Sequence, residues 1–97
     1  MEIKQGSNEF YIGGSPSQAV ARITFIKESD TLIVADHTFV APELRGQNIA
    51  KQLLDRLAEY ARDNHLKIKP LCSYVVKAFE KFDTYQDVQA GKDDANA

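Results

Sequence analysis

The sequence predicts an α+β fold, in which a mainly antiparallel sheet carries two helices and the elements follow in the order β-β-β-β-α-β-α. Three observations lead to this prediction. Four short strand patterns precede residue 41, one long amphipathic helical pattern follows them, and a short strand with a second helical pattern comes last. Because the last strand follows a crossover helix, we expect it to pair parallel to the fourth strand.

The strand patterns differ in how apolar they are. We expect them at residues 2–5, 9–13, 18–27 and 31–40, with turns or loops between them. In the third pattern, Ile23 and Phe25 face one way and Thr24 faces the other. The centre of the fourth is apolar on both faces, which is typical of a strand covered on both sides.

Two helical patterns flank the last strand, which we expect at residues 67–72, interrupted by Pro70. The first helix is expected at residues 46–63, with one apolar stripe. Ser73 is the expected N-cap of the second helix, at residues 74–82. The stripe of the first helix comprises Ile49, Leu53, Leu57 and Ala61, and the apolar side of the second comprises Val75, Ala78, Phe79 and Phe82.

Composition indicates one ordinary globular domain: the chain has 97 residues, of which 43% are hydrophobic and 27% charged. Residues 1–90 are predicted to form this domain, and residues 91–97 to be a disordered tail with nothing to bury. The net charge of −2 provides no broad electropositive field, so nucleic acid is not an expected partner.

The same sequence has no signal peptide and no run long enough to span a bilayer, so we expect no membrane association. Its one cysteine, Cys72, excludes an internal disulfide and favours the cytoplasm. The oligomeric state stays open, with a monomer favoured.

The loop between the fourth strand and the first helix is a candidate anion site. A helix start leaves backbone N–H groups unpaired, and Gly46 allows a ligand to approach the backbone beside Arg45. An ordinary helix start without a ligand is the alternative. The loop lacks both the Gly-x-x-x-x-Gly-Lys-Ser/Thr run of a nucleotide-hydrolysing loop and the Gly-x-Gly-x-x-Gly dinucleotide fingerprint.

The order of the elements and this loop together resemble the GCN5-related N-acetyltransferase superfamily, and in particular its short single-domain members. The likeness extends to about Val88. The residues that carry it are Asp36-His37-Thr38-Phe39-Val40, Arg45-Gly46, Ile49-Ala50, Pro70-Leu71-Cys72-Ser73-Tyr74 and the early Glu9-Phe10-Tyr11-Ile12-Gly13.

The resemblance implies a site for acetyl-CoA. It puts the pantetheine arm along Phe39 and Val40, in a cleft where the fourth and fifth strands splay apart, and includes Ser73 among the CoA-binding residues. The pyrophosphate would lie against Arg45, Gly46, Gln47, Asn48, Ile49 and Ala50.

The chain departs from the family pattern in two places. The loop pattern Gln/Arg-x-x-Gly-x-Gly/Ala falls on Glu43, Gly46 and Asn48, and only Gly46 matches, which implies weaker CoA binding. Asn48 is still able to adopt a left-handed conformation. On the last helix, Phe79 occupies the position of the tyrosine that is proposed to protonate the CoA thiolate, and Cys72 occupies the position of an asparagine.

Cys72 and His37 are the candidate catalytic residues. The short family members carry a cysteine at the position of Cys72, and it has been proposed as the acyl acceptor. Cys72 also precedes a helix start, where the reactive thiolate is favoured; an inert buried thiol is the alternative. Simple alternation puts His37 on the apolar face of Ala35 and Phe39, where a packed histidine is the alternative, and Asp36 on the opposite face.

The sequence therefore predicts a small acetyl-CoA-dependent N-acetyltransferase, with direct transfer and transfer through Cys72 both open. The acceptor is expected to be an amine on a small molecule or peptide. Residues 13–17 join two strands where larger relatives insert helices that shape the acceptor site, which favours a broad, open acceptor site or none. The alternative is an acyl-CoA-binding or protein-interaction module without turnover. No metal site is expected, because Cys72 and the two histidines lack ligand spacing.

Overall fold

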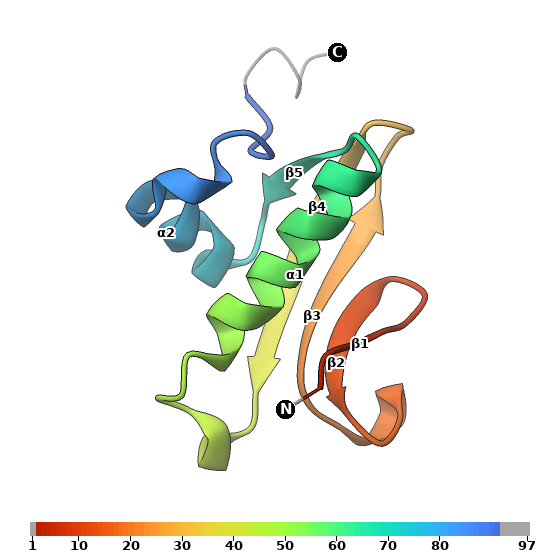
Figure 1. Ribbon diagram of the computed structural model, residues 1–97, viewed down its shortest axis with the longest axis vertical. Helices are drawn as coiled ribbons and strands as arrows, with labels where there is room; N and C mark the ends of the chain where they lie inside the picture. Colours follow the sequence, from red (N-terminus) through yellow and green to blue (C-terminus); the bar gives the residue numbers. More distant parts are fainter. Residues whose placement is uncertain (1, 92–97) are drawn as a thin grey trace.

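The computed structural model describes residues 2–91, which form one five-stranded sheet with two helices (Figure 1). The strands lie in the order β1-β2-β3-β4-β5. The first three pairings are antiparallel and β4 pairs with β5 in parallel, so the predicted fold class is confirmed. The strands are β1 (Lys4–Gln5), β2 (Glu9–Gly13), β3 (Ala19–Lys27), β4 (Leu32–Val40) and β5 (Lys67–Pro70), and the helices are α1 (Ile49–Asp63) and α2 (Ser73–Lys81).

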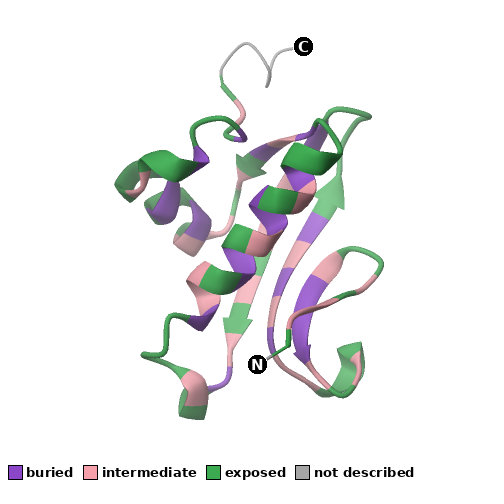
Figure 2. Ribbon diagram, in the orientation of Figure 1, coloured by how far each residue is buried: buried purple, intermediate pink, exposed green. Residues whose placement is uncertain are grey.

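One face of the sheet carries the core, and α1 lies across it (Figure 2). The stripe predicted for α1 is fully or almost fully buried, and Val75, Ala78 and Phe79 of α2 belong to the same core. The opposite face is not covered by a helix, and Ile26 and Phe39 are exposed there at 54% and 43%. None of the helices in the described residues is long and apolar enough to cross a membrane.

A β-bulge in β4 changes which side chains face the core. Thr24 pairs with His37 and Phe25 with Ala35, so Asp36 is an extra residue between the two pairs. The prediction that His37 shares the face of Ala35 was therefore wrong, because simple alternation does not account for the extra residue. The His37 side chain is 79% exposed, on the uncovered face.

Beyond the bulge, Thr38 and Val40 take the face that points toward the helices. They pair with Ile23 and Ala21 of β3, both fully buried on that face. One polar side chain, Thr38, and one apolar side chain, Val40, therefore lie at the edge of the core. This part of β4 pairs with β3 on one edge and with no described strand on the other.

β4 and β5 separate after a short pairing. Their register ends at Ala35 and Pro70, and the amides of Leu71 and Cys72 both donate to the Ala35 carbonyl at 3.0 Å. The strand is therefore shorter than the predicted 67–72, because these amides turn the chain away from β4. The remaining part of β4, from residue 36 to Val40, has a free edge toward α2.

Both helices begin differently from the prediction. α1 starts at Ile49, because Gly46 and Asn48 have left-handed backbone with φ of 84° and 63° and so lie outside the helix. A 3₁₀ turn, η2 (Pro42–Leu44), precedes them. Cys72, not Ser73, is the N-cap of α2, and its side chain makes no capping bond.

The C-terminal segment packs on the core in a way that the sequence patterns did not predict. After η3 (Asp83–Tyr85), Gln89 forms an isolated parallel bridge with Ile68 of β5. Tyr85 and Val88 are each only 1% exposed. The tail predicted to be disordered begins at Gly91, and its remaining residues, 92–97, lie outside the described residues.

The loop before β3 contains a short 3₁₀ turn, η1 (Pro16–Gln18).

Candidate active site

A pocket of about 190 Å³ lies where β4 leads through η2 into α1. It brings together six of the predicted CoA-binding residues, but not Phe39, Gln47 or Ser73, which are exposed outside it. Tyr74 reaches it from α2. The lining residues are Val40, Leu44, Arg45, Gly46, Asn48, Ile49, Ala50, Lys51 and Tyr74.

Unpaired backbone amides line this pocket. The Arg45 amide donates to the Pro42 carbonyl, and the next amide with an acceptor is that of Gln52, which donates to Asn48. Between them, the amides of residues 46–51 have no acceptor in the described part of the chain. Unpaired amides of this kind, with the positive end of the α1 dipole behind them, are chemically suited to an anion.

Gly46 leaves this site open. Its φ of 84° suits glycine, and a Cβ built there would have no heavy atom within 4 Å. A side chain at this position would therefore project into open space beside the loop. The glycine identified from the sequence thus has a conformational role, because its positive φ favours glycine.

Arg45 joins the loop to the end of β4. Its Nε donates to the Val40 carbonyl at 3.2 Å. Because the Ala41 amide donates to Val20 of β3, alternation along the strand turns the polar groups of Val40 away from β3. By the same alternation those of Thr38 face the free edge and those of Phe39 face β3. The free edge of β4 therefore offers the backbone of Thr38 and Val40, whereas the sequence interpretation named Phe39 and Val40.

The two departures from the family's loop pattern have different positions. Asn48 lines the pocket, adopts the left-handed conformation and makes no side-chain capping bond, as its residue type allows. Glu43 lies in η2 and is exposed, and it does not line the pocket.

Cys72, at the start of α2, faces the free edge of β4 across the gap between the two elements. Its thiol is half-buried and donates to the Thr38 hydroxyl, with 3.3 Å between sulfur and oxygen. The N-cap position of α2 orients it, since the Cys72 carbonyl accepts from the Val76 amide at 3.0 Å. Cys72 is thus directed at the free edge of β4.

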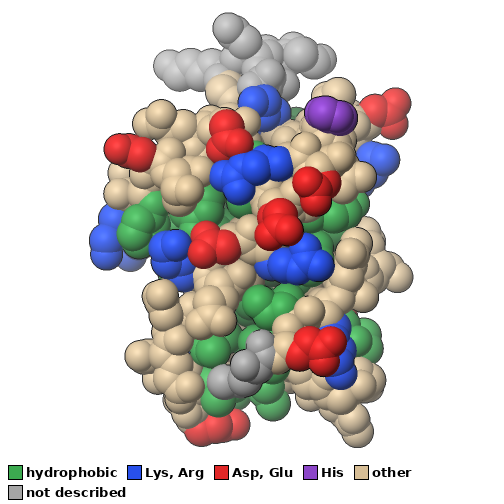
Figure 3. Space-filling model, in the orientation of Figure 1, with side chains coloured by type: hydrophobic (Ala, Val, Ile, Leu, Met, Phe, Trp, Pro, Cys, Tyr) green, Lys and Arg blue, Asp and Glu red, His purple; other side chains and the backbone are tan. Residues whose placement is uncertain are grey.

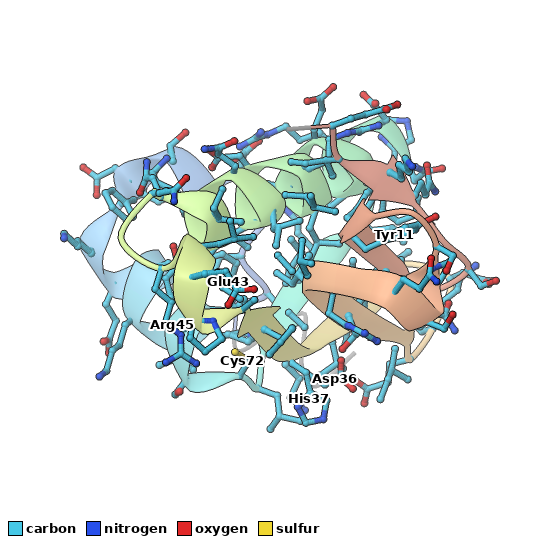
Figure 4. All side chains as sticks on the ribbon, turned by 90° about the horizontal axis from the view of Figure 1, so that it is seen from below. Tyr11, Asp36, His37, Glu43, Arg45 and Cys72 are labelled. Atoms are coloured by element: carbon cyan, nitrogen blue, oxygen red, sulfur yellow. The ribbon has the colours of Figure 1, made fainter. Side chains whose placement is uncertain are left out.

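His37 lies on the uncovered face of the sheet with Asp36 (Figure 4). The His37 Nε2 is 4.0 Å from the Asp36 Oδ2, and the Thr24 hydroxyl donates to the Asp36 Oδ1 at 2.6 Å. The prediction that Asp36 faces away from His37 was wrong, because the bulge turns the two side chains toward one another. Cys72 and His37 lie on different sides of β4, because Cys72 bonds to Thr38 on the side of the buried Ile23, whereas His37 is exposed on the uncovered face.

Phe79 and Tyr74 differ sharply in position. Phe79 is 6% exposed and packs its ring on Tyr85, with 5.4 Å between centroids, so it belongs to the core and not to the pocket. Tyr74 lines the pocket, and the pKa of its hydroxyl is raised by burial and by the nearby Asp55 and Cys72. Tyr74 belongs to the motif at residues 70–74 that carries the family resemblance, but it was not among the predicted site residues.

Comparison with known proteins identifies the class. A sequence profile described as GCN5-related N-acetyl-transferase matches residues 9–88, which is most of the chain. The chain therefore belongs to the GCN5-related N-acetyltransferase family, as its resemblance implied. It is an N-acetyltransferase of the CoA-dependent kind, and its acceptor is not identified by this match.

Solved structures agree with this assignment. A GCN5-like protein from Staphylococcus aureus, for which N-acetyltransferase activity is proposed, is 48% identical, with a TM-score of 0.79 over 93% of this chain and 88% of that one. Among curated proteins, none matches the sequence.

Two more distant structures share the fold alone. The ribosomal-protein-alanine N-acetyltransferase of Brucella melitensis biovar Abortus 2308 is 24% identical, with a TM-score of 0.51 over 92% of this chain and 69% of that one. Rv2747 of Mycobacterium tuberculosis, solved in complex with CoA, is 20% identical, with a TM-score of 0.52 over 63% of this chain and 39% of that one.

Proposed function

We propose that this protein transfers an acetyl group from acetyl-CoA to a primary amine, with the pyrophosphate held by the amides of residues 46–51. One observation carries the proposal: unpaired amides of this loop, the open space at Gly46 and Val40 at the end of β4 meet at one pocket. Charge-assisted bonds from such amides to phosphate oxygens are among the stronger hydrogen bonds in proteins.

The acyl end of the donor is directed by the free edge of β4. The amide and carbonyl groups of Thr38 and the amide of Val40 point away from β3 and suit the amide groups of a pantetheine arm, while the Val40 carbonyl accepts from Arg45. Such an arm leads from the loop toward Cys72 at the end of β5. Acetyl-CoA supplies an activated thioester there, and the residues of this chain bind it, orient it and move protons.

Transfer through Cys72 is the mechanism that we favour. The Cys72 sulfur forms a bond to the acetyl carbonyl carbon, the bond from that carbon to the CoA sulfur breaks, and the thiol proton passes to the departing thiolate. The amine nitrogen then forms a bond to the acetyl carbon, the bond from that carbon to the Cys72 sulfur breaks, and a proton of the amine passes to the departing Cys72 thiolate. Direct attack of the amine on acetyl-CoA is the second mechanism.

Tyr74 and His37 have separate proposed roles. The raised pKa keeps the Tyr74 hydroxyl protonated at neutral pH, so it remains a hydrogen-bond donor at the pocket wall. His37 lies on the other side of β4, where an amine approaching from the uncovered face meets it, and Asp36 orients its ring. His37 is therefore proposed to contact the acceptor on that face before the amine reaches the Cys72 thioester.

The acceptor site is proposed to be broad and open. The connection between β2 and β3 contains only η1, and no helix in the described residues covers the face that carries His37. A site of this shape fits an amine on a small molecule or on a peptide, because either one reaches His37 without passing a lid.

A two-part experiment tests the proposal. Amide shifts are followed during a titration with acetyl-CoA, and transfer and hydrolysis are assayed with a panel of amines. We expect shifts at residues 46–51, Thr38 and Val40, together with turnover. Shifts without turnover on any amine, and without hydrolysis, would identify a binding module instead. Shifts confined to other residues would overturn the site.

A further inference from the structure

A second groove, lined with lysines, continues from the active-site pocket. It has a volume of about 370 Å³ and runs between the first turn of α1 and the outer side of α2. It shares Asn48, Lys51 and Tyr74 with the pocket. We name it the lysine groove, and it is lined by Asn48, Lys51, Tyr74, Lys77, Ala78, Lys81 and Phe82.

The lysine groove is electropositive in a chain whose net charge is −2. Of its lysines, only Lys51 pairs with a carboxylate, that of Asp55 at 3.1 Å. Lys77 and Lys81 form no ion pair with any described residue. Figure 3 shows lysine and arginine side chains over α2 at the left of the view. Glu80, on the same helix, does not line the groove.

An aromatic ring lies among these cations. The Nζ atoms of Lys51 and Lys81 are 5.0 Å and 5.3 Å from the centroid of the Phe82 ring, which is half-buried. Each of these ammonium groups is therefore within cation–π distance of the same ring. Three lysines line one groove and two of them have no carboxylate partner among the described residues, so the groove suits an anion of more than one charge.

The path of the donor decides which anion reaches this groove. The pocket contains both Val40 and Lys51, and it shares Lys51 with the lysine groove. Because the acyl arm is proposed to follow the free edge of β4 toward Cys72, the nucleotide end is expected to leave past Lys51. The nucleotide end of CoA carries a phosphate monoester on its ribose, and a monoester is close to doubly charged at neutral pH.

We propose that the lysine groove binds the 3′-phosphate of CoA and makes the enzyme select 3′-phosphorylated CoA over dephospho-CoA. This inference rests on the proposed function, because it takes the pyrophosphate position from it. Lys77 and Lys81 are the specificity-determining residues, and Lys51 serves both the pyrophosphate and the 3′-phosphate. Lysine suits this role, since it acts as a mobile point charge.

The test compares the affinities of CoA and 3′-dephospho-CoA, measured by calorimetry in low salt, for the full chain and for Lys77→Gln/Lys81→Gln. Lys27→Gln is the control, since Lys27 is an exposed lysine at the end of β3. We expect the unmodified chain to bind CoA at least about tenfold more tightly than dephospho-CoA. The double variant is expected to lose that preference and to bind dephospho-CoA as before.

Added salt is expected to reduce the preference for CoA over 3′-dephospho-CoA, because salt screens the attraction between exposed lysines and the phosphate. The three substituted lysines, Lys27, Lys77 and Lys81, are exposed, so the variants are expected to remain folded. Circular dichroism checks the fold. Equal binding of both ligands by the unmodified chain, or an equal loss for both ligands in the double variant, overturns the groove and leaves the proposed function standing. Binding of neither ligand overturns the proposed function as well.

Discussion

The thiol of Cys72 donates a hydrogen bond to the hydroxyl of Thr38, with 3.3 Å between sulfur and oxygen, although the two residues are 34 positions apart in the sequence. Cys72 lies just beyond the end of β5, and Thr38 lies on β4 beyond the last pairing of the two strands. The bond therefore spans the gap that the strands leave open. It directs the only cysteine of the chain at the edge where an acyl arm is proposed to bind.

The first prediction concerns this cysteine. Incubation with acetyl-CoA is expected to acetylate Cys72, visible as an increase in intact mass that hydroxylamine reverses. Saturating CoA is expected to protect the thiol from iodoacetamide. Cys72→Ser is expected to fold and bind CoA but to lose transfer by roughly tenfold or more, because a hydroxyl is a weaker nucleophile than a thiolate.

Two other outcomes have distinct signatures. In direct transfer, Cys72→Ser keeps its rate and no thioester is found. If the thiol only packs in the core, alkylation is slow with or without CoA, and that result would sink the nucleophile proposal. Thr38→Val is the matched variant, because it keeps the volume of the side chain and removes only the hydrogen bond to the sulfur.

The second prediction concerns Gly46. Gly46→Val is expected to weaken CoA binding by at least about tenfold, because a β-branched side chain strains a residue at positive φ and fills the approach to the amides. Isothermal titration measures the affinity, and a heteronuclear NMR spectrum checks the fold. Gly14→Ala is the control, since Gly14 lies far from the pocket in the loop before β3. Unchanged affinity in a folded Gly46→Val protein would remove the phosphate site.

The third prediction concerns Asn48. Asn48→Gly is expected to tighten CoA binding, because it opens the wall of the pocket. Asn48 precedes α1 and has left-handed backbone, so glycine costs no helix propensity there. The free energy of unfolding is therefore expected to change by less than about 0.5 kcal/mol. Urea denaturation checks it, and weaker CoA binding by the variant would show that the Asn48 side chain contacts the ligand.

The fourth prediction concerns His37. His37→Gln is expected to raise KM for the amine by up to about tenfold, because a contact to the acceptor is lost, and to leave kcat and the affinity for CoA nearly unchanged. The change is confined to the acceptor side because His37 is exposed on the uncovered face and does not line the pocket. Steady-state kinetics with a varied amine measures it. His65→Gln is the matched control, and equal kinetics in both variants would refute the role.

The fifth prediction concerns the pair that fastens the C-terminal segment to α1. The Arg62 Nε and the Asp87 Oδ2 are 2.6 Å apart, and the hydrogen bond from Arg62 lowers the pKa of the Asp87 carboxyl below its usual value near 3.8. A carboxyl whose folded-state pKa is lowered stabilises the fold above its unfolded pKa. That contribution disappears as the pH falls through the folded-state value.

Asp87→Asn is therefore expected to reduce the free energy of unfolding at pH 7 by less than about 1 kcal/mol, since both side chains are half-exposed. The difference from the unmodified chain is expected to vanish near pH 2. Thermal melts at pH 7 and at pH 2 measure this difference in stability. Asp63→Asn is the control, since Asp63 lies on α1 beside Arg62. A constant difference at both pH values would contradict the assigned cause.

Local patterns were enough to predict the order of the elements and the loop at Gly46. The stripe of α1 follows from a 3.6-residue period, and the restriction of Pro42 and the freedom of Gly46 are properties of single residues. The parallel pairing of β5 follows from the crossover helix alone. These features depend only on nearby residues, and the sequence alone contains them.

Other features depend on partners that are distant in the sequence. The bulge that brings Asp36 to His37 exists only in the register of β4 against β3, and the burial of Tyr85 and Val88 depends on β5. The lysine groove combines a residue of α1 with residues of α2. The bulge, and with it the face on which His37 lies, is fixed by the pairing of β4 with β3. The charge of the lysine groove arises where α1 and α2 meet. Only the tertiary structure decided these two parts of the site.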